Sequence, residues 1–248
     1  METHFLEASA EDRLTTIRSR IETALIGTNR KLSDITLIAV SKGHPTEAIR
    51  GLYELGIRDF GESYVQEFSQ KTHELAELKD IRWHFIGHLQ SNKAKKLIVQ
   101  RPLIHSLDRL SLLNELAKYT DPANPMRVLL QLQVDPSDVN KSGCARAEAE
   151  ALCQRMTEIP GLLWEGFMGI GPADCAPERL RWHYEQFTSF ARLLWEQFSL
   201  RDPSRQTREP RISLGMSDDL EIALRSGANT VRIGSHLFGP RPAKSQAT

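Results

Sequence analysis

The sequence is poor in cysteine, has no excess of either charge and contains no long apolar run. Its three cysteines are Cys144, Cys153 and Cys175, and no two of them form a Cys-x-x-Cys pair. This pattern indicates neither a disulfide framework nor a zinc ribbon, and a reducing compartment is the simpler expectation. Lysine plus arginine and aspartate plus glutamate both number 32, so the formal net charge is zero. The composition therefore gives no reason to expect nucleic acid or an anionic membrane surface as a partner.

Sequences that direct a protein to or across a membrane are also lacking. No stretch of about 18 apolar residues is present, so we expect no helix that spans a membrane. Residues 1–11 contain three acidic residues and no long apolar stretch, which is unlike a secretory signal. We therefore expect a cytoplasmic protein without a membrane partner.

The sequence does contain a regular alternation of two kinds of segment. Short apolar or β-branched runs predict buried strands, and longer segments with apolar residues every three to four positions predict helices. The predicted strands are 36–41, 59–61, 83–87, 103–106, 127–134, 163–168, 211–214 and 230–233. The predicted helices are an N-terminal helix at 9–27, within the first 30 residues, and others at 46–55, 64–78, 92–99, 109–119, 145–158, 178–198 and 218–226.

This order of elements predicts the fold class. Strands that alternate with helices form parallel sheets, and this many strand–helix units in about 250 residues indicate a single α/β domain, a (β/α)8 TIM barrel. A doubly wound open sheet is the alternative, but its dinucleotide-binding form needs a G-x-G-x-x-G turn after the first strand, where 42–45 read Lys-Gly-His-Pro. We expect one domain over 1–248, with an exposed loop at 200–210 and a frayed tail at 241–248.

Barrel enzymes place their chemistry at the C-terminal ends of the strands, and phosphate sites often use the loops after strands seven and eight. After strand seven, Gly215 allows a tight turn and is followed by Met216 and Ser217. We expect Ser217 to cap the next helix, with Asp218 and Asp219 in its first turn. Free N–H groups there would suit an anion, although a plain helix cap has the same sequence pattern.

The loop after strand eight offers a second set of backbone amides, at Gly234 and Ser235. Arg232 alternates with the apolar residues beside it, so it points to the opposite face of the strand. Inside the barrel it would be a buried charge that needs an anionic or acceptor partner, whereas on the helix side it would pair with a carboxylate. Two such loops on the two expected strands favour a phosphorylated ligand.

Lys42 ends the first strand, where catalytic residues of a barrel belong. A lysine with a lowered pKa forms imines with aldehydes, although a single lysine is more commonly a solvated surface residue. Glu62 and Glu67 could serve as acid and base, but their position near a helix start is typical of capping or solvated residues. His84 and His88 lie in a strand and its following loop, which does not suit a zinc pair.

Five segments together resemble one known family. They are Ala-Val-Ser-Lys at 39–42, Phe-Gly-Glu-Ser-Tyr-Val-Gln-Glu at 60–67, Trp-His-Phe-Ile-Gly-His-Leu-Gln-Ser-Asn-Lys at 83–93, Ser-Leu-Gly-Met-Ser-Asp-Asp at 213–219, and Val-Arg-Ile-Gly-Ser at 231–235 with Phe-Gly at 238–239. The sequence resembles the pyridoxal phosphate homeostasis proteins (the YggS/PROSC family). The sequence departs from the family pattern in two places: Ser63 replaces an Asn, and Gly43-His44 stand where a Thr usually follows the Ser-Lys pair.

The resemblance implies the barrel of the alanine racemase N-terminal domain (fold type III of the pyridoxal phosphate proteins), without that enzyme's extra β-domain. It implies that Lys42 holds pyridoxal 5′-phosphate (PLP) as a Schiff base. It also implies that Gly215, Met216 and Ser217, with Gly234 and Ser235, bind the phosphate. Arg232 would then line the cofactor.

The resemblance further implies a role in intracellular PLP homeostasis, in which a monomer buffers PLP or delivers it to PLP-dependent apo-enzymes. The alternative is an amino-acid racemase-like enzyme, which needs a base on each face of the substrate. Because the sequence ends nine residues after Gly239, we expect no second domain that could supply one. An arginine beside the ring nitrogen would also weaken PLP as an electron sink. We therefore expect a carrier without robust turnover. A barrel phosphosugar isomerase is a third option, and it would form no imine.

Overall fold

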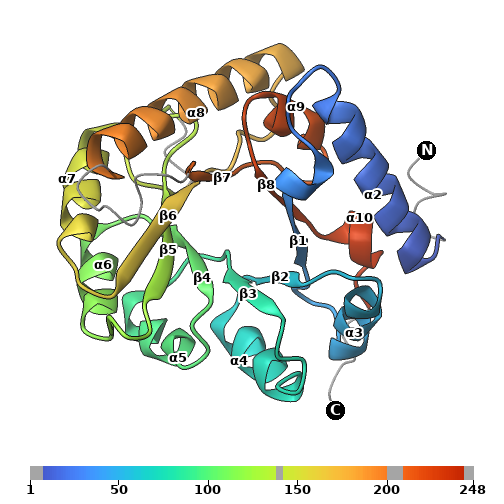
Figure 1. Cartoon of the computed structure of the whole chain (residues 1–248), viewed down its shortest axis with the longest axis horizontal. Coiled ribbons are helices and arrows are strands. Elements are labelled where there is room, and N and C mark those ends of the chain that lie inside the picture. Colours follow the sequence, from blue (N-terminus) through green and yellow to red (C-terminus); the bar gives the residue numbers. More distant parts are fainter. Residues whose placement is uncertain (1–7, 138–141, 200–208, 243–248) are drawn as a thin grey trace.

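The computed structural model describes residues 8–137, 142–199 and 209–242, in which eight parallel strands form one closed barrel (Figure 1). The strands are β1 Thr36–Val40, β2 Asp59–Glu62, β3 Arg82–Phe85, β4 Leu103–Leu107, β5 Met126–Gln131, β6 Leu162–Met168, β7 Arg211–Ser213 and β8 Thr230–Ile233. β8 returns to β1, with Leu37 paired to Val231. The predicted (β/α)8 barrel is confirmed, and an open sheet is excluded because it would leave two unpaired edge strands.

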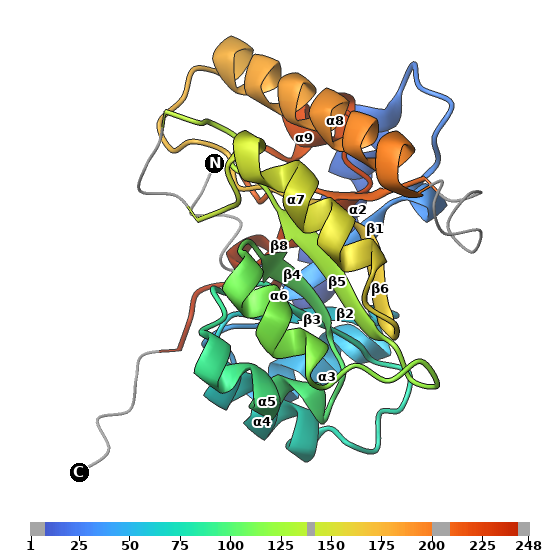
Figure 2. The same ribbon diagram turned by 90° about the vertical axis from the view of Figure 1, so that its left-hand side faces the viewer.

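Helices surround the barrel on its outer side, as Figures 1 and 2 show. They are α2 Ala10–Leu25, α3 Thr46–Glu54, α4 Val65–Glu74, α5 Ala94–Ile98, α6 Leu110–Ala117, α7 Arg146–Thr157, α8 Pro177–Ser199, α9 Leu220–Arg225 and α10 Ser235–Phe238, with 3-10 turns η1 Leu32–Asp34 and η2 Ser91–Lys93. Helix α2 precedes the first strand and lies against α9 and α10. It therefore borders the loops that follow β7 and β8. No helix in the described part of the chain is both long and apolar enough to cross a membrane.

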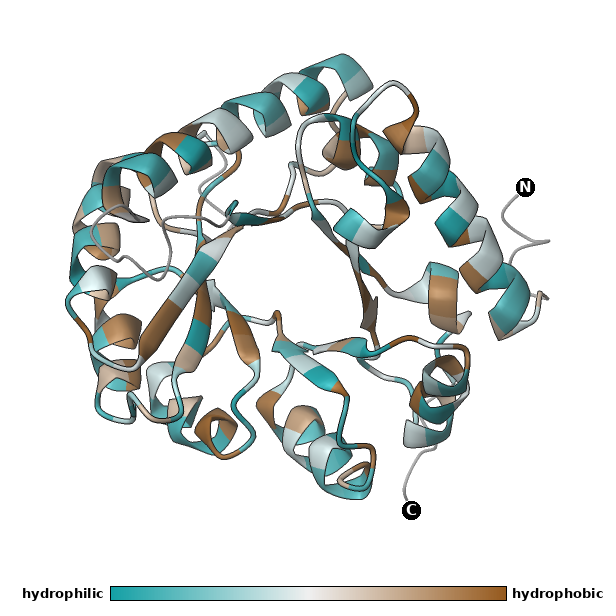
Figure 3. Cartoon of the chain, viewed as in Figure 1, coloured by the Kyte–Doolittle hydropathy of each residue, from teal (hydrophilic) through white to brown (hydrophobic). Residues whose placement is uncertain are grey.

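Most of the apolar core lies between the strands and these helices. The helices alternate hydrophilic and hydrophobic residues along their length in Figure 3, as expected of helices with one buried face. Helix α2 buries Leu14, Ile17 and Ile21, whose spacing of three to four residues is the pattern that predicted a helix here. Its start is fixed by a capping box between Ser9 and Asp12.

The interior of the barrel is unusually polar. Such interiors are commonly filled by layers of Val, Ile and Leu. Here His84, His105, Ser213 and Arg232 are all buried. His105 on β4 lies 3.2 Å from Ser213 on β7, measured from Nδ1 to Oγ, and these two strands are not neighbours in the sheet. The contact therefore crosses the barrel, and hydrogen bonds replace part of the aliphatic filling.

Some boundaries differ from the prediction. Strand β5 ends at Gln131 rather than at residue 134. The Leu132 N–H still donates to Met168 O of β6 at 2.9 Å, but the Gln133 N–H donates to Cys144 O at 3.1 Å instead. The four-residue helix α10 was not predicted. Most of the loop predicted at 200–210 and of the tail predicted at 241–248 lies outside the described residues. The single domain over 1–248 stays a prediction for the same reason.

Candidate functional site

Lys42 lies directly after β1, at the C-terminal end of the barrel. Ser41 N–H donates to Gly61 O over 3.0 Å, so the pairing with β2 continues to the residue before the lysine. His44 N–H then returns to Ser41 O, which makes a tight turn around Lys42. The turn uses Gly43 at φ +76°, a conformation that glycine favours. The Lys42 side chain is half-buried and, among the described residues, has no hydrogen bond or ion pair, so its amine is available to a ligand.

A buried cluster of charged side chains forms hydrogen bonds to this turn. Lys71 Nζ donates to Ser41 O at 2.7 Å, to Glu62 Oε1 at 2.6 Å and to Glu67 Oε1 at 2.7 Å. Glu67 Oε1 also accepts the Gly43 N–H at 2.6 Å, and Glu62 Oε1 accepts the Ser41 hydroxyl at 2.6 Å. The residues on both sides of Lys42 are thus bonded to one ion-pair cluster, which fixes the backbone that carries the lysine.

The structure corrects the interpretation of Glu62 as a capping or solvated residue. Its side chain is fully buried, because it lies on β2 beneath α4 rather than on a helix surface. Burial raises the pKa of Glu62, and the Lys71 ammonium opposes this effect. Its second oxygen, Oε2, has no hydrogen-bond partner among the described residues. Lys71 itself was missed, although its spacing of four residues from Glu67 was a readable signal for a pair on one helix.

The loop after β7 brings Gly215, Met216 and Ser217 to the same end of the barrel. Gly215 has φ +87°, and a Cβ there would lie 2.6 Å from the Cβ of Ala223, so only glycine fits without a shift. Met216 is exposed, and its N–H donates to Asp219 Oδ1. Ser217 is half-buried, and its carbonyl accepts from Arg20 Nη2 at 2.8 Å.

Ser217 is not the N-cap of the next helix, so this prediction was wrong. Helix α9 starts at Leu220, with Asp219 at the N-cap position. The Asp219 carboxylate accepts the Met216 N–H and the hydroxyl of Tyr184, at 2.5 Å in each case. These two donors hold the carboxylate in the loop, so the chain turns before the helix begins. The Ser217 hydroxyl is left without a capping role.

The loop after β8 lies beside the end of β1. A Cβ built on Gly234 would be 3.6 Å from Val40 O, so this loop adjoins the strand that carries Lys42. Helix α10 begins at Ser235 with no side-chain cap, and the first N–H groups of a helix have no acceptor within it. The backbone N–H of Arg232 in β8 donates to Gly215 O at 3.1 Å, which joins the end of this strand to the loop after β7. The structure thus brings the predicted loop residues together around one face.

Arg232 points into the barrel, which was one of the two predicted alternatives; the other placed it on the helix side. Its Nη1 donates to Ser213 O at 2.8 Å and to Ser213 Oγ at 2.7 Å, and its Nη2 donates to Gly169 O at 2.9 Å. Burial lowers the pKa of this guanidinium, with Tyr184 and Asp219 opposing the effect, but an arginine stays protonated in proteins. No carboxylate within the described residues pairs with it directly. A buried cation next to two amide-bearing loops favours an anionic or electron-rich ligand.

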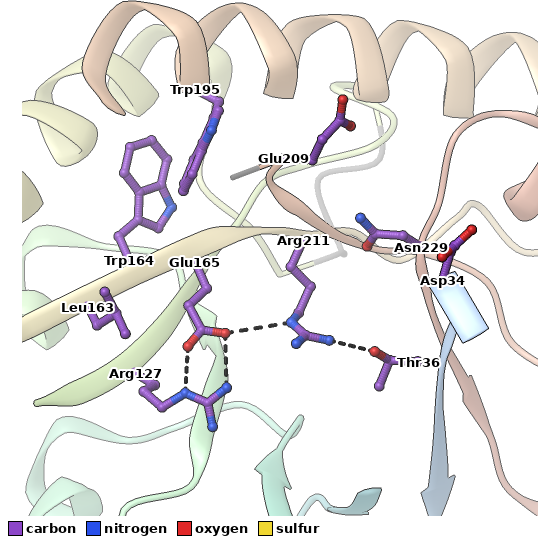
Figure 4. Close-up of a pocket in the computed structure, with 10 residues that line it drawn as sticks. All are labelled: Asp34, Thr36, Arg127, Leu163, Trp164, Glu165, Trp195, Glu209, Arg211 and Asn229. Atoms are coloured by element: carbon purple, nitrogen blue, oxygen red, sulfur yellow. Dashed lines mark hydrogen bonds and ion pairs between the residues drawn. The ribbon is translucent and has the colours of Figure 1, made fainter. Parts of the chain in front are cut away.

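This arrangement can hold a small phosphorylated carbonyl compound. The loops offer backbone N–H groups to a phosphate, and Lys42 offers an amine that can form an imine with an aldehyde. The opposite end of the barrel is different. A cavity of about 310 Å³ there is lined by the starts of β1, β5, β6 and β7, where Glu165 joins Arg127 and Arg211 (Figure 4). It contains none of the predicted site residues, and its arginines already have partners.

Known proteins share both the fold and the sequence pattern. The family described as alanine racemase, N-terminal domain, matches residues 25–242. The pyridoxal phosphate homeostasis protein of Pseudomonas aeruginosa is 38% identical over 232 residues, which cover 93% of this chain and 95% of the relative. The structure of PipY from Synechococcus elongatus PCC7942 with PLP bound is 32% identical, with a TM-score of 0.79, and covers 93% of this chain and 100% of PipY.

The alanine racemase of Corynebacterium glutamicum is a more distant neighbour. It is 15% identical with a TM-score of 0.62, and the match covers 94% of this chain and 62% of the racemase. The similarity to the racemase therefore concerns the fold of the barrel alone.

Proposed function

Because the chain belongs to the alanine racemase N-terminal domain family and, within it, to the pyridoxal phosphate homeostasis proteins, we propose that it binds PLP and acts in intracellular PLP homeostasis. The observation that carries this proposal is the match to PipY, which was solved with PLP bound and is covered over its whole length. The geometry of the C-terminal face supports it, since two amide-bearing loops meet there with Lys42, which has no partner within the described ranges.

The proposal assigns a role to each predicted residue. Lys42 holds the PLP aldehyde as a Schiff base, and its half-buried position with no competing partner among the described residues supports this role. The N–H groups of Ser217, Gly234 and Ser235 bind the phosphate, while Gly215 provides the turn. Met216 lines the site by its side chain, because its N–H already donates to Asp219.

Arg232 faces the cofactor ring in this proposal. Bound PLP supplies a reactive aldehyde and an electron-withdrawing ring. The residues around the ring determine how strongly it can stabilise a carbanion. A guanidinium keeps its protons, so Arg232 would offer a hydrogen bond to the ring nitrogen without protonating it. This arrangement favours storage of the aldehyde over stabilisation of a carbanion.

We therefore propose a carrier that buffers PLP or delivers it to apo-enzymes as a monomer, rather than an efficient catalyst. A racemase needs a base on each face of the substrate. Tyr64 is 64% exposed, and the Tyr184 hydroxyl is engaged by Asp219. Burial raises the pKa of Tyr184, which makes it a poor base at neutral pH. Neither tyrosine in this part of the described structure is thus suited to be the second base.

A transfer assay tests this function. Protein loaded with PLP and freed of excess cofactor would be mixed with the apo-form of a PLP-dependent enzyme, and the recovery of that enzyme's activity would be followed. We expect recovery with the wild-type protein and none with similarly treated Lys42→Ala, while neither protein racemises alanine at a measurable rate. Racemisation or transamination that is robust and depends on Lys42 would contradict the carrier and favour the racemase-like alternative.

A further inference from the structure

A continuous chain of hydrogen bonds runs through the barrel from Arg232 to Asp59. Arg232 Nη1 lies 2.7 Å from Ser213 Oγ, which lies 3.2 Å from His105 Nδ1. His105 Nε2 lies 3.0 Å from His84 Nδ1, and His84 Nε2 lies 2.9 Å from Asp59 Oδ1. The five residues come from β8, β7, β4, β3 and β2, so the chain spans the interior.

The far end of this chain is anchored as an anion. Arg82 binds Asp59 with two hydrogen bonds, from Nε at 2.9 Å and from Nη2 at 2.6 Å. Burial by itself would raise the pKa of Asp59, but Arg82 and His84 hold it well below its usual range. Asp59 is therefore a carboxylate, which can only accept hydrogen bonds.

An anion at one end fixes the direction of every bond. Burial lowers the pKa of both His84 and His105, so both are neutral and each carries one N–H. Since Asp59 accepts, His84 carries its proton on Nε2 and accepts at Nδ1. His105 must then donate from Nε2 and accept at Nδ1, and the Ser213 hydroxyl donates to it. Ser213 Oγ is left to accept from Arg232, which agrees with the observed contact.

We propose that Asp59, His84, His105 and Ser213 form a positioning relay that orients the Arg232 guanidinium toward the bound cofactor and thereby sets the affinity and the absorption of bound PLP. This inference rests on the proposed PLP site. The four residues act through Arg232 and touch no ligand themselves.

The donors of Arg232 show why its orientation matters. An arginine has five N–H donors in a fixed fork. Three are taken by Ser213 O, Ser213 Oγ and Gly169 O. The Nε–H and the second Nη2–H have no acceptor among the described residues, although the side chain is only 4% exposed. A ligand acceptor at this end of the side chain would complete the set, and the relay determines where those donors point.

A purely structural role explains the relay less well. Apolar residues of similar volume in place of buried ionic groups are often neutral or stabilising. Val, Ile and Leu would fill a barrel interior without two histidines whose tautomers must match. The bonds all run in one direction, from Arg232 as the first donor to Asp59 as the last acceptor, and Arg232 is the member of the chain that faces the proposed cofactor. This arrangement points to control of Arg232.

The first test needs no cofactor. Nitrogen-15 NMR of the apo-protein, labelled at histidine, reports the tautomer of each ring. We expect both His84 and His105 as neutral rings protonated on Nε2. A ring protonated on Nδ1, or a cationic ring at neutral pH, would overturn the direction of the relay, whatever the protein does with PLP.

The second test uses PLP titration of the apo-protein followed by visible absorbance. In His105→Leu we expect about tenfold weaker binding, about 1.4 kcal/mol, and a displaced absorption band, with partial return of both in His105→Gln. Leu129→Ala is the control, because Leu129 is a buried barrel residue outside the relay. Ser213→Ala, a small change that the fold should tolerate, should behave like His105→Leu.

The outcomes separate the two proposals. Wild-type affinity and an unchanged band in both His105→Leu and Ser213→Ala would overturn the relay and leave the PLP site standing. An equal loss of PLP affinity and an equal band shift in Leu129→Ala would show that the effect comes from core packing, which would overturn the relay. A wild-type protein that takes up no PLP would instead remove the proposed function and the relay with it.

Discussion

At the scale of single residues, the site depends on buried charges whose partners lie on neighbouring strands as well as on their own helix. Lys71 shows this well, because it serves Ser41, Glu62 and Glu67 at once. Lys42 could be predicted from its place at a strand end, but the burial of Lys71 could not. That burial results from the packing of α4 against β2, which no local pattern in the sequence describes.

Removal of the Lys71 charge should therefore be costly. Lys71→Met keeps most of the volume but leaves Glu62 and Glu67 close together without a cation. We expect a loss of about 3 to 5 kcal/mol in the free energy of unfolding, as for other broken buried pairs. Urea denaturation measures this loss, with Lys118→Met as the control, since Lys118 forms an exposed pair with Glu115. Equal small losses in both variants would contradict the cluster's importance.

Because two histidines are buried in the barrel interior, we expect the stability of the protein to depend on pH. In an unfolded chain histidine binds a proton near pH 6.5, whereas burial, and then the neighbouring His84 and Arg232, lower the pKa of His105 in the fold. Between the two values the unfolded state binds more protons, so stability is greatest above the ordinary pKa and falls as the pH drops below it. The slope is up to about 1.4 kcal/mol per pH unit for each such group.

Unfolding in urea between pH 7.5 and 5 measures this slope. In His105→Gln the free energy of unfolding should fall less steeply with decreasing pH than in the wild-type protein. Parallel pH curves for the two proteins would show that His105 does not titrate in this way.

At the scale of elements, strands were more predictable than caps and short helices. Most strand positions follow from a compact apolar or β-branched run, and the barrel then requires all eight strands to pair, including β2, whose sequence is Asp-Phe-Gly-Glu. Helix α10 has four residues, too few for a periodic pattern, and was missed. The prediction of Ser217 as the N-cap was wrong because the Asp219 carboxylate accepts two hydrogen bonds, one of them from Tyr184, which is distant in sequence.

Helix α2 connects to both proposed phosphate loops. Arg13 Nε donates to Leu237 O at 2.8 Å, at the end of α10. Arg20 donates to Ser217 O at 2.8 Å and forms a two-point ion pair with Glu221 on α9. The N-terminal helix thus supports both loops from outside the barrel, a role that its amphipathic pattern alone does not reveal.

Loosening of this support should weaken PLP binding. Arg20→Met removes the bond to Ser217 O, and we expect a few-fold increase in the Kd for PLP, equivalent to about 1 kcal/mol. Arg155→Met is a matched control, because Arg155 lies on α7 in an exposed pair with Glu158. Equilibrium titration with PLP measures both. An unchanged affinity in Arg20→Met would show that the loop does not need this helix.

At the scale of the whole molecule, the two ends of the closed barrel differ: the N-terminal end is closed by ion pairs, and the C-terminal end carries the proposed site. Glu165, Arg127 and Arg211 form ion pairs at the N-terminal end, where Arg211 also reaches Thr36 (Figure 4). The lysine and the amide-bearing loops gather at the other end. The sequence order of strands was enough to predict this separation, because all parallel strands end on the same side. The polar interior between the two ends was not predictable, since its contacts join residues as far apart as His105 and Ser213.

The central claim is that Lys42 carries PLP, and reduction with borohydride followed by peptide mass mapping tests it most directly. Protein incubated with PLP and then reduced should gain one pyridoxyl phosphate group on the peptide that contains Lys42. The visible absorption band should disappear on reduction and be absent from Lys42→Ala. A group fixed instead to another lysine, or a protein that gains none, would contradict the account.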